Sequence, residues 1–122
     1  MATPMRRQRV AEQIRQELSS IIQHDIRDPR KGWVTVTRVE MSSDLCYARV
    51  FISILGDEEA QQASWAVLER AVAYMRGELG RRIRRLRQIP ELQLKHDDSL
   101  EHSQRVMDIL RDTPIPPESE ES

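Results

Sequence analysis

The spacing of the apolar residues constrains the fold of this chain more than any other feature. Between residues 10 and 26 they recur at helical intervals and form one stripe, which consists of Val10, Ile14, Leu18, Ile21, Ile22 and Ile26. Thr3 and Pro4 precede this stripe and fit an N-cap and a first helical residue. In "RDPRKG", Pro29 disfavours helical geometry at the residue before it, and Gly32 permits a turn. We therefore predict a helix that ends at this segment.

Two stretches then follow the period of a β-strand. "WVTVTRVEM" and "CYARVFISIL" are rich in β-branched and aromatic residues, and the polar "SSDL" between them predicts a hairpin. In the second stretch alternate residues share one face, which consists of Cys46, Ala48, Val50, Ile52 and Ile54. We expect this face to meet the core, with Cys46 as an inert filler.

A long amphipathic segment follows Gly56 and Asp57. Its apolar side consists of Leu68, Val72, Met75, Leu79, Ile83 and Leu86. Trp65 falls near the same side and is predicted to belong to the core rather than to stack on a base. "IPEL" ends the segment, "LQLKH" predicts a short third strand, and "DSLEHSQRVMDIL" predicts a last helix.

The predicted order is helix, strand, strand, long helix, strand, which defines an α+β domain with helices covering one face of a small sheet. We expect one domain over residues 1–112 and a disordered, acidic, proline-rich tail over residues 113–122. No stretch approaches the ~20 continuous apolar residues of a membrane span. The first residues lack the apolar segment of a secretory signal, and Cys46 is the single cysteine. These features predict a cytoplasmic protein.

Arginine is distributed unevenly along a chain whose formal net charge is −1. Between residues 70 and 87 one acid, Glu78, faces seven arginines, which are Arg70, Arg76, Arg81, Arg82, Arg84, Arg85 and Arg87. Arg6, Arg7 and Arg9 crowd the start of the first helix, where the helix dipole disfavours cations. Solvent-exposed helix faces that bind no partner normally carry both signs of charge. The concentration of arginines here therefore indicates a basic binding surface.

On an unbroken helix these side chains fall into two groups. Opposite the apolar side lie Arg70, Arg81, Arg84, Arg85 and, among them, Tyr74. On its flanks lie Arg76, Arg82 and Arg87, whose methylene stems can cover its edges. An external polyanion would relieve the repulsion among them. We expect RNA rather than duplex DNA, because no helix-turn-helix, zinc finger or basic zipper is present.

The order of elements is also that of KH-type RNA-binding domains, which clamp RNA backbone through a G-x-x-G turn between two helices. "GELG", from Gly77 to Gly80, fits this motif by its letters. Two glycines three residues apart are common by chance, and a bend in a packed helix explains them equally well.

Four stretches are together specific in their order and spacing. They are "RVAEQIRQELSSIIQHDIRDPR", "VTVTRVEMSSDLCYARVFIS", "MRGELGRRIRRLRQIPEL" and "DDSLEHSQRV". From about Arg6 to Met107 the chain resembles the bacterial ribosome-binding factor A family. The resemblance implies a KH-like fold that begins with a helix, no catalysis, and a role in late maturation of the small (30S) ribosomal subunit and processing of its 16S rRNA. It also implies binding to free 30S subunits near the 5′-terminal helix of 16S rRNA.

The resemblance further implies a kink in the long helix at an Ala-x-Gly sequence, which aligns with residues 71–73. Ala71 matches this sequence, whereas Ala73 replaces its glycine. Gly80 stands where the family often has glycine, and Gly77 does not match. The position of the kink therefore stays open among these four residues.

We predict phosphate contacts from the core of the arginine-rich segment and from the N-terminus. The principal candidates are Arg81, Arg82, Arg84 and Arg85, with Arg6, Arg7 and Arg9 as a second strip. Further candidates are Arg70, Arg76 and Arg87, and Tyr74 as a base-stacking residue. We expect a monomer that requires no metal, cofactor, small-molecule substrate or membrane.

Other functions remain open at this point. His96, Asp97, Asp98, Glu101 and His102 could imitate an enzyme site, but their spacing lacks a helical metal motif and no nucleophile–base pair is visible. A basic amphipathic helix could lie on anionic lipid, although this one lacks exposed-looking aromatic anchors on its apolar side. The acidic tail could bind other proteins or shield the basic face. A generic KH-like adaptor for single-stranded RNA is the main alternative.

Overall fold

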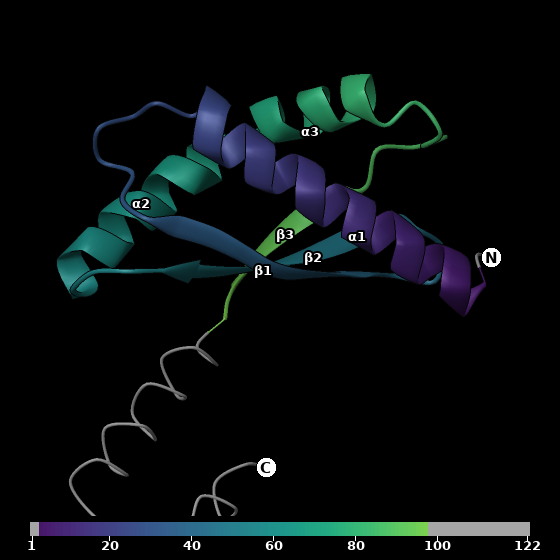
Figure 1. Ribbon diagram of the computed structural model, residues 1–122, viewed down its shortest axis with the longest axis horizontal. Coiled ribbons are helices and arrows are strands. Elements are labelled where there is room, and N and C mark those ends of the chain that lie inside the picture. Colours follow the sequence, from purple (N-terminus) through teal and green to yellow (C-terminus); the bar gives the residue numbers. More distant parts are fainter. Residues whose placement is uncertain (1–2, 98–122) are drawn as a thin grey trace, which may run out of the picture.

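The computed structural model of the chain describes residues 3–97 (Figure 1). The predicted last helix and the predicted tail, residues 113–122, lie outside the described residues. The first helix, α1, spans Pro4–Ser20 and begins as predicted. The Thr3 hydroxyl accepts a hydrogen bond from the Arg6 backbone nitrogen at 3.1 Å and thereby caps the helix.

A wider, π-helical turn, η1, continues α1 over Ile21–Asp25. Its backbone bond runs from the Ile26 nitrogen to the Ile21 carbonyl oxygen, five residues back, at 3.2 Å. The wide turn lets the adjacent Ile21 and Ile22 both face the core. The predicted stripe is buried from Ile14 onward, and Val10 is half-buried against the core.

The sheet contains β1 (Val34–Met41), β2 (Tyr47–Ile54) and β3 (Glu91–His96) in the order β1-β2-β3. β1 and β2 form the predicted antiparallel hairpin, whereas β3 runs parallel to β2. The alternating apolar row of β2 is buried as expected. Cys46 does not belong to that row. It lies just before β2, is half-buried, and has its sulfur 3.5 Å from the side-chain nitrogen of Gln88.

β1 contains a bulge. Its register against β2 shifts between Val36 and Arg38, so that Thr37 is an extra residue. The residues of β1 that face the core on either side of this bulge are Val34, Val36, Val39 and Met41. The Thr37 hydroxyl hydrogen-bonds the Phe51 carbonyl oxygen at 3.2 Å and the Asp97 carboxylate. Thr37 therefore links the edge strand β1 to the residue that follows β3.

The long predicted helix is divided into α2 (Glu58–Arg70) and α3 (Val72–Arg82). The break lies at Ala71, whose backbone has φ −91° and ψ 0°. The Ala71 nitrogen still donates to the carbonyl oxygens of Val67 and Leu68, at 3.1 and 3.0 Å. The structure therefore places the interruption at the first position of the implied Ala-x-Gly kink.

The other three kink candidates lie within the continuous helix α3, so no bend occurs at Ala73, Gly77 or Gly80. Gly80 instead permits close packing. A Cβ atom at this position would lie 2.6 Å from the Cδ1 atom of Ile89. Gly77 has no such neighbour within 4 Å.

The predicted architecture is confirmed: α1 and α3 lie over one face of the sheet, and α2 lies beside one end of it (Figure 1). The core fills the space between α1, α3 and the inner face of the strands. Ser64 of α2 is fully buried, and its hydroxyl accepts a hydrogen bond from the Gly32 nitrogen at 2.8 Å. Trp65 is half-buried against the core, as expected.

Candidate nucleic-acid interface

The arginine-rich segment leaves the helix earlier than its pattern predicts. α3 ends at Arg82, and residues 83–90 form a connection to β3. Ile83 is buried at φ −115°, and Leu86 turns back toward it through a hydrogen bond from its nitrogen to the Ile83 carbonyl oxygen at 3.3 Å. The exposed arginines of this connection are Arg84, Arg85 and Arg87. The expectation of a helix as far as Leu86, with Arg84 and Arg85 on its far face, is therefore wrong.

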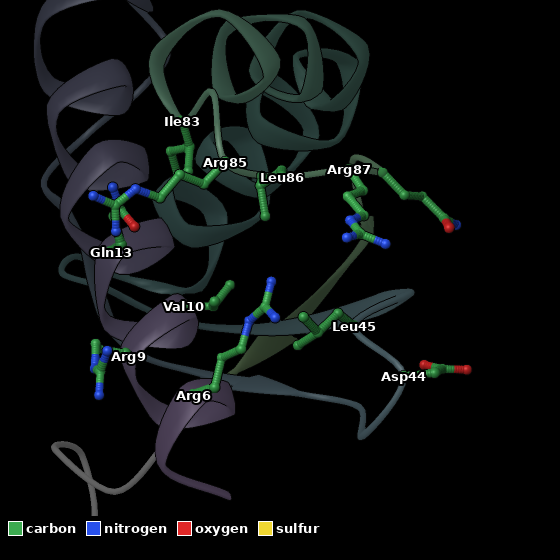
Figure 2. Close-up of a pocket in the computed structure, with 11 residues that line it drawn as sticks. Arg6, Arg9, Val10, Gln13, Asp44, Leu45, Ile83, Arg85, Leu86 and Arg87 are labelled. Atoms are coloured by element: carbon green, nitrogen blue, oxygen red, sulfur yellow. The ribbon is translucent and has the colours of Figure 1, made fainter. Parts of the chain in front are cut away.

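A cleft of about 490 Å³ lies where this connection approaches the N-terminal half of α1 and the turn before β2 (Figure 2). Four arginines from the first two of these segments line it: Arg6, Arg9, Arg85 and Arg87. We call this site the arginine cleft. Figure 2 shows Arg6 and Arg87 directed into the space between the segments, Arg85 reaching across toward Gln13, and Arg9 directed away. The fold thus joins two arginine groups that are far apart in the sequence.

Apolar side chains form the floor of the arginine cleft. Val10, Leu45 and Leu86 line it and are half-buried against the core, and the buried Ile83 lies among them. The rim is therefore cationic and the floor apolar. Sequence reasoning missed Val10 and Leu45 as site residues, because nothing in their local pattern distinguishes them from core residues.

The charge of the arginine cleft is not neutralised by its neighbours. Among the described residues, Arg6, Arg9, Arg85 and Arg87 form no ion pair with a carboxylate. Asp44 lines the cleft but points away from the arginines in Figure 2. Hydrogen bonds from the Ser42 hydroxyl, at 2.7 Å, and from the Cys46 nitrogen, at 3.0 Å, lower the pKa of Asp44. This carboxylate is thus engaged in holding its own turn.

Arg82 has an internal role instead. Its guanidinium pairs with Asp25 at 2.9 Å, Glu78 at 3.2 Å and Glu17 at 3.6 Å. Burial opposes the charge of Arg82, but these carboxylates outweigh it and raise the pKa of the group. The Tyr74 hydroxyl donates to the same Asp25 carboxylate at 2.9 Å, which raises the pKa of Tyr74. Both side chains therefore tie α3 to η1, and Arg82 also ties it to α1.

Arg76 also makes internal contacts. Its guanidinium donates to the carbonyl oxygens of Ile89 and Pro90, at 3.0 and 3.1 Å. These bonds hold the connection against α3 just before β3 begins. Apart from Glu78, the acceptors of Arg76 and Arg82 lie 13 or more residues away in the chain, so local sequence could not separate these arginines from their neighbours.

The remaining predicted residues are scattered over the surface. Arg81 is 72% exposed and pairs with Glu78 at 3.0 Å. Arg70, at the end of α2, lies near enough to Asp28 to lower the pKa of that carboxyl, although Arg30 is the main cause. Arg7 lies apart from the arginine cleft, in a groove between α1 and β1.

That second groove carries arginines that were not predicted as site residues. They are Arg15, Arg38 and Arg49, and each has an acidic partner. Arg15 pairs with Glu12 at 2.6 Å, and Arg38 pairs with Glu40 at 3.1 Å. Arg38 also lies 3.9 Å from the centre of the Phe51 ring. The groove therefore mixes both signs of charge.

Two members of the candidate enzyme cluster, His96 and Asp97, lie within residues 3–97, and both contact neighbouring side chains. The His96 ring stacks on Trp65 with ring centres 4.2 Å apart, and Asp97 bonds Thr37. Asp98, Glu101 and His102 lie outside the described residues. Within residues 3–97, no group of side chains is suited to hold a metal ion. No helix in this part of the chain is long and apolar enough to cross a membrane.

Comparison with known proteins identifies relatives over most of the chain. Residues 6–110 match the family model described as ribosome-binding factor A. The ribosome-binding factor A of Desulforamulus reducens is 46% identical over 107 residues, which are 88% of each chain. That of Brevibacillus brevis is 48% identical over 104 residues, which are 85% of each chain.

Solved structures give the same result. The crystal structure of ribosome-binding factor A from Thermus thermophilus superposes with a TM-score of 0.65 at 28% identity, and the match covers 74% of this chain and 93% of that one. A homology model of the Thermus thermophilus protein, fitted into the cryo-EM map of a 30S–RbfA complex, matches with a TM-score of 0.60 at 28% identity. This match covers 72% of this chain and 91% of that model.

Proposed function

The chain belongs to the ribosome-binding factor A family, and from this premise we propose that it binds the 30S ribosomal subunit and assists its maturation. The arginine cleft carries the proposal at the level of residues. Four arginines line it without a carboxylate partner among the described residues, and Arg6 and Arg87 point into it (Figure 2). Guanidinium groups in this state are available to the phosphates of rRNA, with which they form bidentate bonds.

Further details of the role are also part of the proposal. The protein acts in the cytoplasm on free 30S subunits, near the 5′-terminal helix of 16S rRNA, supports the processing of that RNA, and catalyses no reaction itself. Arg81 and Arg84 extend the contact surface beyond the arginine cleft, because both are exposed, Arg81 at the end of α3 and Arg84 in the connection that follows it. Arg76 and Arg82 contribute by holding this surface in place.

Cosedimentation tests the proposal. The chain is mixed with free 30S subunits or with assembled ribosomes, and the bound fraction is measured at several salt concentrations. We expect binding to free 30S subunits that exceeds binding to assembled ribosomes. Equal binding to both particles, and to unrelated RNA, would favour a generic RNA-binding adaptor.

A matched pair of variants assigns the contact surface. Arg6→Gln, Arg85→Gln and Arg87→Gln together remove three cations from the arginine cleft, whereas Arg15→Gln, Arg38→Gln and Arg49→Gln remove three from the second groove. We expect the first variant to lose cosedimentation at physiological salt and the second to retain it, because the second set is already paired with acids. Equal losses would show that only net charge matters.

A further inference from the structure

We propose that the arginine cleft receives the base of one unpaired ribonucleotide, with the adjoining phosphates held by the arginines of its rim. This inference rests on the proposed function, and it names the feature of the RNA that the cleft recognises. Phosphate binding alone requires no apolar surface. The half-buried Val10, Leu45 and Leu86 provide such a surface at the centre of a cationic rim. A nucleotide matches both parts, since the faces of its base are apolar and its phosphate is anionic.

The directions of the side chains support this assignment. Arg6 and Arg87 point into the cleft from opposite segments, and the side chains of Val10, Leu45 and Leu86 lie around the tip of Arg6 (Figure 2). Splayed-out bases in RNA complexes stack on the planes of arginine guanidinium groups as well as on aromatic rings. A base seated on this floor would have the two guanidinium groups beside it. Gln13 lines the same cleft, and its side-chain amide offers both a donor and an acceptor to a base edge.

Leu45 provides an independent observation. Its backbone has φ 63°, a left-handed conformation that bulky residues rarely adopt. The turn enforces this geometry: the Leu45 nitrogen donates to the Ser42 carbonyl oxygen at 3.0 Å, and Asp44 bonds the Ser42 hydroxyl and the Cys46 nitrogen. Glycine or asparagine would adopt this conformation with less strain. Strain of this kind gathers at functional sites, and here it places an apolar side chain on the floor of the cleft.

Size and position are consistent with a single nucleotide. A volume of about 490 Å³ falls within the range of pockets that hold small ligands. The cleft adjoins the C-terminal end of α3, whereas the helix break at Ala71 lies at its N-terminal end. The arginine cleft is therefore separate from any contact made at the helix break.

A bulged RNA hairpin tests the inference on the full chain. The probe carries one unpaired 2-aminopurine, and the two comparison hairpins carry an abasic bulge or no bulge. Affinity is measured by fluorescence anisotropy, and the 2-aminopurine emission reports the surroundings of the base. We expect the base-bearing bulge to bind at least tenfold more tightly than either comparison, with a change in emission. Equal affinity for the base-bearing and abasic bulges would overturn the inference.

Variants of the floor and the rim complete the test. Leu45→Gly and Leu86→Ser are expected to abolish the tenfold preference and to keep the salt-dependent affinity for paired RNA. Leu55→Ala, at an exposed leucine elsewhere, is expected to retain the preference. Urea unfolding checks that each variant is folded. Arg87→Gln, at an exposed position, keeps the test decisive if a floor variant does not fold, and it should lower affinity for the base-bearing bulge at least fivefold.

The two proposals fail in different ways. Cosedimentation with free 30S subunits without a preference for the base-bearing bulge would overturn the nucleotide inference and leave the proposed function intact. A clear preference for that bulge without cosedimentation would support the nucleotide inference and contradict the assignment to the subunit.

Discussion

The guanidinium of Arg82 meets carboxylates from three segments of the chain. Glu17 lies on α1, Asp25 lies in η1, and Glu78 lies one turn earlier on α3. The Arg82 side chain is only 28% exposed, so its pairs are screened less than pairs at the open surface. The neighbouring Arg81 is 72% exposed and pairs only with Glu78 among the described residues. Two adjacent arginines thus have unlike roles.

We expect Arg82→Gln to lower the free energy of unfolding clearly more than Arg81→Gln does, because half-buried carboxylates lose their charged partner. Arg81→Gln should change it by less than about 0.5 kcal/mol, as is usual for an exposed pair. Urea unfolding of the two variants measures the difference. Equal effects would contradict the internal role assigned to Arg82.

Sequence alone could not have separated these residues. Arg81 and Arg82 share the same neighbours in "LGRRIR", and both count equally in any local charge pattern. What distinguishes Arg82 is Asp25, which lies 57 residues earlier in the chain. Only the packing of α3 against the end of α1 brings the two together.

Asp28 makes the stability depend on pH. The Arg30 guanidinium donates to its carboxylate at 2.6 and 3.0 Å, and the Arg30 nitrogen adds a bond at 2.9 Å, which together lower the pKa of Asp28 to about 2. The pKa of an aspartate in the unfolded chain is about 4. Because the folded-state pKa is the lower one, the contribution of Asp28 is present above about pH 4 and is lost as the pH falls toward 2.

This prediction is checked by urea unfolding between pH 2 and pH 5 on the natural chain and on Asp28→Asn. The natural chain should lose more stability over this range than the variant, which has no carboxyl to titrate at this position. The difference between the two curves is diagnostic, because Glu12 and Asp44 also have lowered pKa values and affect both proteins alike. Parallel curves would show that the Asp28–Arg30 contact does not contribute to folding.

At the scale of elements, α3 contains two glycines in unlike surroundings. Alanine is favoured over glycine inside a helix by about 1 kcal/mol. We expect Gly77→Ala to gain about this amount, because beyond the adjacent residues and the backbone of α3 itself no atom lies within 4 Å of the added methyl group. Gly80→Ala should gain less, since Ile89 must move to make room. Thermal and urea unfolding of both variants measure the difference, and an equal gain would mean that Ile89 moves without cost.

The end of α3 shows where a helical pattern misleads. Ile83 and Leu86 continue the apolar spacing of the helix, and both do contact the core. They reach it from a turn, in which residues three apart also share a side. The apolar periodicity therefore predicted the burial of these two side chains correctly. It predicted a helical backbone at Ile83 and Leu86 incorrectly. The apolar spacing could not locate the break at Ala71 either. Leu68 before the break and Met75 after it are both buried, as they would be in one continuous helix.

At the scale of the whole molecule, the salt dependence of RNA binding should report how many phosphates the arginine cleft neutralises. Each neutralised phosphate of a single strand changes the slope of log K against log salt by about 0.7. The variant that lacks Arg6, Arg85 and Arg87 should therefore bind with a slope shallower by about 2. Anisotropy titrations at several salt concentrations measure it, and an unchanged slope would place the phosphate contacts elsewhere.

The fold class could be predicted from the sequence, because the apolar residues of each element repeat with the period of a helix or of a strand. α1 carries a helical stripe, β2 alternates, and the tertiary structure preserves both. The arginine cleft did not follow, because it requires α1, the turn at Leu45 and the connection after α3 to meet. The sequence showed that the arginines are concentrated in two segments. The fold determines which of them line the arginine cleft. Arg6 and Arg87 line the arginine cleft, whereas Arg7, on the same turn of α1 as Arg6, lines the second groove.

The bulge at Thr37 has a consequence for the length of β1. Val36 and Val39 both face inward although an odd number of positions separates them, and the extra residue absorbs the difference. Deleting Thr37 would place Val34, Val36, Val39 and Met41 in strict alternation, so all four would stay on the core face and keep their partners on β2. The shortened hairpin would instead lose the hydrogen bonds of the Thr37 hydroxyl to the Phe51 carbonyl oxygen and the Asp97 carboxylate, which join β1 to the residue after β3.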